Sequence, residues 1–223
     1  MIWTSKQWPV QAFFSMFYLV DYMLSYHVGL TPLDTSRIVG LVHHIPTLYF
    51  CYVILMDHAF WANKMDHTTV TSHYLVDYAA AYFLYDVAQI MRNFIRQVNG
   101  IRPKQFLFFM HGFYCYQVFH YIHKLEKGHF FAAAFLTWEA STPFYYAMHY
   151  MKKNTTLYKI NSILFALLFV TFRIGFGTYV VYGMAWPFLT WYWKAVGVCL
   201  TFLNYYWGSL ILRNAKKTLT STS

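Results

Sequence analysis

Long apolar runs separated by short polar gaps recur along the whole chain. Seven of them approach the roughly 20 residues that a helix needs to cross a bilayer. They cover approximately residues 8–29, 38–60, 73–91, 105–122, 130–150, 160–183 and 195–212. The runs lack the two-residue alternation of barrel strands, and in lipid a helix satisfies its own backbone groups. The pattern therefore predicts an all-α integral membrane protein with about seven transmembrane helices.

Composition and charge support the same class. Of 223 residues, 58% are hydrophobic and only 11% are charged, against about 25% charged in soluble domains. The net charge of +9 could suggest nucleic-acid binding, but the basic residues occupy the gaps between apolar runs, as in membrane proteins. We therefore expect no nucleic-acid partner. No separate soluble domain fits between the runs.

Neither a disulfide framework nor a metal site is expected. The cysteines are scattered singly within apolar runs, at Cys51, Cys115 and Cys199, which argues against both a disulfide framework and a zinc cluster. His43 and His44 are adjacent, and adjacent helical residues diverge by about 100°. A metal site needs further convergent ligands, and the spacing provides none.

The basic residues are distributed unequally between alternate gaps. One set of gaps holds Arg37, Arg92, Arg96, Arg102, Lys104, Lys152, Lys153, Lys159, Arg213, Lys216 and Lys217, and the other holds Lys6, Lys64, Lys124, Lys127 and Lys194. Because positive loops remain cytoplasmic, the C-terminus is predicted to be cytoplasmic. Asn154 begins an Asn-Thr-Thr acceptor sequence in a cytoplasmic gap, so we expect it to be unmodified.

Several ionisable residues lie inside the apolar runs, where a charge costs about 2.5–3.5 kcal/mol. They are Asp21, His43, His44, Asp77, Asp86, His111, Glu139 and Arg173. From the helical rise, Glu139, Arg173 and His111 lie about 14, 15 and 16 Å from the outer ends of their spans. We predict that Glu139 pairs with Arg173, with His111 in the same layer. Pro143 should free the carbonyl of Glu139 from its helical bond.

Helical spacing suggests which groups face a polar cavity. Tyr82, Tyr85 and Asp86 share one face of the third span, whereas Asp77 points the other way and is expected at the outer end. Glu139, Arg173, Tyr82 and Tyr85 are the predicted polar lining of a cavity that handles a lipid head group or an acyl transfer. The alternative is that these groups pair only to hold the helix bundle together.

Six short motifs follow one another along the chain. They are S-R-x-V-x-x-x-H at Ser36–His43, Y-F-L-Y-D at Tyr82–Asp86, F-F-M-H at Phe108–His111, W-E-A-S-T-P-F at Trp138–Phe144, F-R-I at Phe172–Ile174 and L-N-Y-Y-W at Leu203–Trp207. Together they resemble the TLC domain family, which includes ceramide synthases and translocating-chain-associated membrane proteins. The resemblance sets expected boundaries of 1–35 for an N-terminal helix and loop, 36–217 for the TLC domain and 218–223 for a cytoplasmic tail. It implies about six helices around a central cavity, usually in the endoplasmic reticulum.

The chain departs from the ceramide-synthase pattern at two points. The synthases carry paired histidines where this chain has His111-Gly112, and a second aspartate near the position of Asp86. The resemblance therefore implies a lipid-binding protein, or one that influences lipid composition, with membrane lipid as its partner and no cofactor. One alternative is an N-acyltransferase that uses acyl-CoA as substrate, with His111 and Asp86 as catalytic residues. Another is a non-enzymatic partner of other membrane proteins, or a homo-oligomer. The residues leave open whether the chain is an enzyme.

Overall fold

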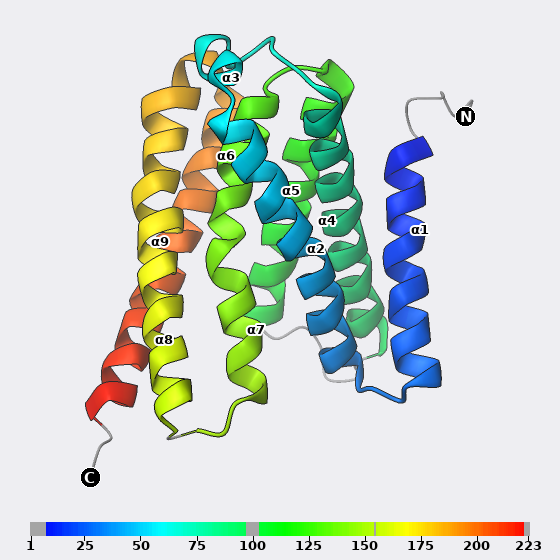
Figure 1. Ribbon diagram of the computed structural model, residues 1–223, viewed down its shortest axis with the longest axis vertical. Helices are drawn as coiled ribbons and strands as arrows, with labels where there is room; N and C mark the ends of the chain where they lie inside the picture. The colour runs from blue at the N-terminus through cyan, green and yellow to red at the C-terminus, as the bar shows by residue number, and fades with distance from the viewer. Residues whose placement is uncertain (1–7, 97–102, 154, 221–223) are drawn as a thin grey trace. The chain divides into compact units, whose positions relative to one another are not determined.

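The computed structural model describes residues 8–96, 103–153 and 155–220, and every regular element in these ranges is helical (Figure 1). The predicted all-α fold is therefore confirmed. The chain divides into two compact units, Met1–Ala132 and Ala133–Ser223. Each unit has its own set of packed helices and is described by itself.

The first unit is built around one long central helix, α4 (Val70–Arg96), which packs against α1, α2 and α5. Helix α1 (Trp8–Tyr22) continues as the π-helical turn η2 (Met23–His27). Helix α2 (Pro32–Met56), the short α3 (His58–Ala62) and α5 (Pro103–Leu125) complete the set, with the start of α6 (His129–Leu136). Small residues along α4, including the fully buried Ala79 and Ala81, allow its neighbours to approach closely.

The boundaries of α2 follow from its sequence. Pro32 occupies the first turn, where its missing N–H costs nothing, and the Thr31 side chain accepts a bond from the Asp34 N–H at 3.2 Å. At the other end Asp57 is the C-cap of α2 and also the N-cap of α3, where its carboxylate accepts a hydrogen bond from the Ala59 N–H at 2.9 Å.

The second unit contains two interrupted helices and one continuous helix. The 3₁₀ segment η3 (Thr137–Ser141) separates α6 from α7 (Thr142–Tyr150). Helix α8 (Thr156–Leu168) runs into the π-helical segments η4 (Phe169–Phe176) and η5 (Tyr179–Ala185) and the short 3₁₀ segment η6 (Trp186–Phe188). Helix α9 (Trp191–Thr220) packs against α8 and η4. The expected span 130–150 is thus not one regular helix.

Three helices among the described residues are long and apolar enough to cross a membrane, at Asp34–Met56, Thr156–Phe188 and Trp191–Thr218. They expose large apolar side chains, such as Ile45, Leu167 and Phe202, as helices in contact with lipid do. Helices α1, α6 and α7 have only 15, 8 and 9 residues, too few for a full crossing as single regular helices. The count of about seven spans and the central cavity stay predictions.

Candidate functional site

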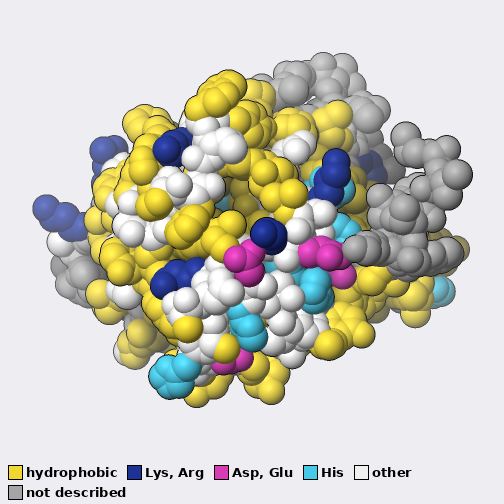
Figure 2. Space-filling view, turned by 90° about the horizontal axis from the view of Figure 1, so that it is seen from above, with side chains coloured by type: hydrophobic (Ala, Val, Ile, Leu, Met, Phe, Trp, Pro, Cys, Tyr) yellow, Lys and Arg dark blue, Asp and Glu magenta, His cyan; other side chains and the backbone are white. Residues whose placement is uncertain are grey.

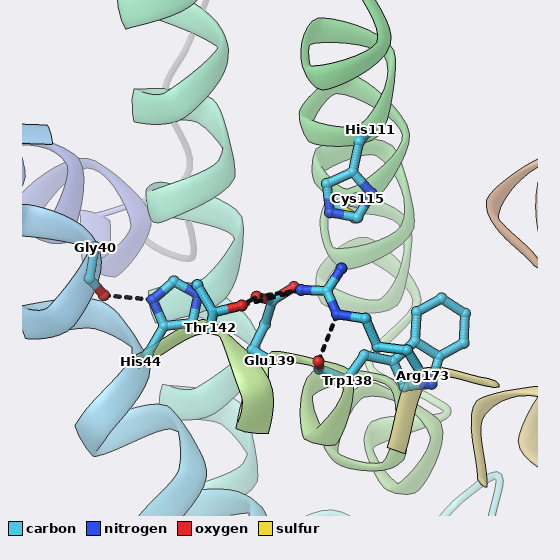
Figure 3. Close-up of polar contacts among 8 residues, drawn as sticks. All are labelled: Gly40, His44, His111, Cys115, Trp138, Glu139, Thr142 and Arg173. Atoms are coloured by element: carbon cyan, nitrogen blue, oxygen red, sulfur yellow. Dashed lines mark hydrogen bonds and ion pairs between the residues drawn. The ribbon is translucent and has the colours of Figure 1, made fainter. Parts of the chain in front are cut away.

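The second unit contains a buried cluster of charged and polar groups around Arg173 (Figure 3). Arg173 Nη2 donates to Glu139 Oε2 at 2.7 Å, and both side chains are at least nine-tenths buried. The Thr142 hydroxyl also donates to Glu139 Oε2, at 2.5 Å, while Arg173 Nε donates to the carbonyl of Trp138 at 2.7 Å. The predicted pairing of Glu139 with Arg173 is confirmed, and two further groups hold the pair in place.

Pro143 acts on the local backbone differently from the prediction. The carbonyl of Glu139 is not left free, because it accepts the N–H of Thr142 in a 3₁₀ bond. Proline removes the donor four residues on, and the chain tightens by one residue instead of opening. The prediction was therefore wrong about this carbonyl. The tightened turn places the side chains of both Glu139 and Thr142 toward Arg173.

Glycine allows an indole ring to pack beside this cluster. A Cβ atom on Gly177 would lie 2.5 Å from Trp138 Nε1, so only glycine leaves room for the ring. Among the described residues, the buried Trp138 Nε1, the Ser141 hydroxyl and the Asn204 amide have no hydrogen-bond partner. Unsatisfied buried polar atoms are uncommon in proteins and call for an explanation.

In the first unit, the Asp86 side chain of α4 reaches α5 at Gly112, the residue next to His111. The Asp86 carboxylate lies against the backbone of α5, with Oδ2 3.1 Å from the place of a Cβ atom on Gly112. The next residue back is His111, whose ring nitrogens Nε2 and Nδ1 are 3.8 and 3.9 Å from the Cys115 sulfur. Phe83 meets the imidazole edge-on, with ring centroids 6.4 Å apart. The contact of Cys115 with His111 was not predicted, although the four-residue spacing that places them on one helix face is visible in the sequence.

Tyr82 and Tyr85 are not brought together with Asp86. The Tyr82 ring stacks on His43 of α2 with centroids 3.8 Å apart and planes nearly parallel, whereas Tyr85 packs against Phe17 of α1. Tyr82 also contacts Phe17, so the two tyrosines share a neighbour on α1, whereas Asp86 lies against α5. The role of the two tyrosines in lining a lipid cavity stays a prediction.

The adjacent histidines of α2 are part of the core. His43 and His44 are both buried, and His44 Nδ1 forms a short hydrogen bond with the carbonyl of Gly40 (Figure 3). His43 Nδ1 lies 3.4 Å from the hydroxyl of Thr47. In the part of the chain that the structure describes, no three His, Cys, Asp or Glu side chains are arranged to hold a metal ion.

The first unit also contains two buried carboxylates that the sequence did not pair. Asp77 accepts from His123 Nδ1 at 2.5 Å, which links α4 to the end of α5. Asp21 of α1 accepts from Gln89 Nε2 at 3.1 Å and lies 3.6 Å from Arg92 Nη1. The positions of Asp77 and His123, near the outer ends of consecutive antiparallel spans, were the signal for the first pair.

Polar side chains gather at the α3 end of the first unit, which Figure 2 views from above. Lys127 and Asp66 pair at 2.8 Å, and the Gly128 N–H donates to the carbonyl of Met65 at 2.7 Å. His129 lies directly before the expected span 130–150, and its Nδ1 is 2.8 Å from the Ser72 hydroxyl. Burial of the ring, followed by repulsion from the neighbouring His73, lowers the pKa of His129 to about 4.

The comparison with protein families gives one match. A model of the TLC domain matches residues 35–213, which is most of the chain. Among curated proteins and solved structures, none matches. The matched region includes Asp86, His111 and the Glu139–Arg173 pair. With its apolar helices, the chain is an integral membrane protein, and it belongs to the TLC domain family.

Proposed function

We propose that the protein binds a membrane lipid and thereby influences membrane lipid composition. The buried cluster around Arg173 is the observation that carries this proposal. The Glu139–Arg173 pair is electrically neutral as a whole, and Trp138 Nε1 and the Ser141 hydroxyl nearby are buried without a hydrogen-bond partner in the described chain. A lipid head group offers donors and acceptors for such atoms, while its acyl chains remain in hydrocarbon.

Lipid mass spectrometry of the purified protein tests the proposal. The double variant Glu139→Gln with Arg173→Gln removes both charges while keeping neutrality, and we expect it to lose the lipid that co-purifies with the wild type. Arg37→Gln is the matched control, because Arg37 forms a partly exposed pair with Asp34 at 3.1 Å elsewhere in the chain. The same lipids at the same ratio on all three proteins would contradict lipid binding at this cluster.

A second candidate function is acyl transfer from acyl-CoA to an amine such as a sphingoid base. The contact of Asp86 with α5 beside His111 favours it, because the transfer needs a base to remove a proton from the attacking amine. In this function His111 is the base, and Asp86 supplies negative charge that stabilises the protonated imidazole.

Product analysis with long-chain acyl-CoA and a sphingoid base tests the second candidate. His111→Ala should abolish turnover while the protein still folds and inserts. His149→Ala is the control, because His149 is an exposed histidine of α7. Absence of any N-acylated product with the wild-type protein would contradict the acyltransferase function and leave lipid binding unaffected.

The proposal also includes a location and an orientation. The family resemblance supports the endoplasmic reticulum, and the excess of basic residues in alternate gaps supports a cytoplasmic C-terminus. The same asymmetry puts the α3 end of the first unit, with Lys64 and Lys127, on the luminal side.

A further inference from the structure

We propose that Cys115 is an acyl-accepting nucleophile, which takes an acyl group from an acyl thioester such as acyl-CoA with His111 as its base. The inference rests on the acyl-transfer candidate for its acyl donor, and it goes beyond that candidate by naming a covalent acyl-protein. It is drawn from the contact between Cys115 and His111, where the thiol sulfur lies within 4 Å of both imidazole nitrogens.

The geometry suits a nucleophile and its base. Cys115 and His111 are four residues apart on α5, so their side chains lie on the same face of the helix. The sulfur is 3.8 Å from Nε2 and 3.9 Å from Nδ1, nearly equal distances. A rotation of the imidazole about its Cβ–Cγ bond would turn one nitrogen toward the thiol. Both side chains are half-buried, and so remain accessible to a ligand.

The position along α5 suits a substrate with a long acyl chain. Cys115 lies 12 residues from Pro103 and 10 from Leu125, or about 18 and 15 Å from the two ends of the helix. With α5 as the predicted fourth span, a thioester held at this depth would have its acyl chain in hydrocarbon. Phe83 and Phe119, which stack with centroids 5.5 Å apart, provide an apolar wall beside His111.

The other two cysteines lack this arrangement and serve as internal references. Cys51 is fully buried, and the residues four positions away are Thr47 and Leu55. Cys199 is exposed, and its corresponding neighbours are Ala195 and Leu203, so no imidazole shares its helix face at that spacing. Cys199 therefore reports any uncatalysed acylation by the reagent, whereas Cys51 reports acylation that requires unfolding.

The proposed step exchanges one thioester for another. An imidazole nitrogen of His111 accepts the thiol proton, and the Cys115 thiolate attacks the carbonyl carbon of the acyl-CoA. The carbon–sulfur bond to coenzyme A breaks, and the imidazolium returns the proton to the departing thiolate. The products are S-acylated Cys115 and free coenzyme A, with no oxidant or reductant consumed. An amine could then take the acyl group from Cys115.

The experiment incubates the purified full-length protein with palmitoyl-CoA in the absence of an amine. Intact-mass spectrometry should show one added palmitoyl group that neutral hydroxylamine removes, and peptide mapping should place it on Cys115. Cys115→Ala should abolish this label, whereas Cys51→Ala and Cys199→Ala should retain it. His111→Gln should slow labelling by about 100-fold, the usual contribution of a general base, and flatten the dependence of the labelling rate on pH.

The outcomes separate this inference from the acyltransferase function. A palmitoyl label that persists in Cys115→Ala, or that maps only to Cys199, would overturn the inference, as would the absence of any label. Full N-acylation of a sphingoid base by Cys115→Ala, together with no label on Cys115 of the wild type, would overturn it while leaving the acyltransferase function intact. Labelling of Cys115 without N-acylation would support the inference and contradict the acyltransferase function.

Discussion

Removing one charge of the Glu139–Arg173 pair should destabilise the second unit strongly, and removing both should restore much of the loss. Glu139→Gln leaves the guanidinium of Arg173 buried without a counter-charge. Arg173→Gln leaves the carboxylate with the hydroxyl of Thr142 and removes the donor to the Trp138 carbonyl. In the double variant both side chains are neutral amides that can bond to each other.

The expected magnitudes follow from burial. Both side chains are less than a tenth exposed, and breaking a buried pair by removing one partner costs about 3–5 kcal/mol. The double variant loses chiefly the bond to the Trp138 carbonyl and the charge assistance of the remaining bonds, or about 1–3 kcal/mol. The coupling free energy between the two sites should therefore be at least about 3 kcal/mol in favour of the pair.

The free energy of unfolding in mixed micelles, followed by circular dichroism and tryptophan fluorescence, measures this coupling. Asp34→Asn and Arg37→Gln form a matched control cycle, because that pair has a similar distance of 3.1 Å but is partly exposed. Its coupling should be under about 1 kcal/mol. If the Glu139–Arg173 double variant loses as much as the two single variants together, the residues are not energetic partners and the reasoning fails.

Three further predictions concern packing, pH and topology. Gly177→Ala should lower the free energy of unfolding by about 1–3 kcal/mol, because its Cβ would lie 2.5 Å from Trp138 Nε1, whereas Gly175→Ala, with 3.5 Å to the nearest atom, should not destabilise. The folded pKa of His129, about 4, lies below its unfolded value of about 6.5. The contribution of His129 to thermal stability should therefore be full above pH 6.5 and fall as the pH is lowered toward 4, because the unfolded chain binds the proton first. His129→Gln should weaken this fall in thermal stability. Asn154, outside the described residues, should carry no glycan; a glycosidase-sensitive mass shift that Asn154→Gln removes would reverse the predicted orientation.

The sequence predicted those features that depend on the length and periodicity of apolar runs. Each of the seven expected ranges overlaps a helical segment of the structure. The Glu139–Arg173 pair was predictable for a related reason. Two opposite charges at equal depth on consecutive antiparallel spans are expected to pair, because either charge buried alone is strongly destabilising. Depth along a helix can be estimated from residue number alone.

The orientation of side chains around a helix was less predictable. Tyr82, Tyr85 and Asp86 lie within five residues, but the two tyrosines both contact Phe17 of α1 while Asp86 lies against α5, because α4 is surrounded by neighbours. The π-helical segment that carries Arg173 also changes the rotation per residue, and nothing in the run of apolar residues signals it. The shared face of Tyr82, Tyr85 and Asp86 that ideal helical spacing predicted is therefore found only in part.

Gly112 shows how one departure from a family pattern can change the chemistry of a site. A Cβ atom at this position would lie 3.1 Å from Asp86 Oδ2 and 3.3 Å from the Val87 side chain, so any side chain here would require both to shift by a few tenths of an ångström. The glycine thus leaves room for the close approach of Asp86 to α5. The imidazole of His111 then has the thiol of Cys115, one turn further along α5, as the nucleophile beside it. For that reason we assign the acyl-accepting role to a cysteine and the role of base to the single histidine.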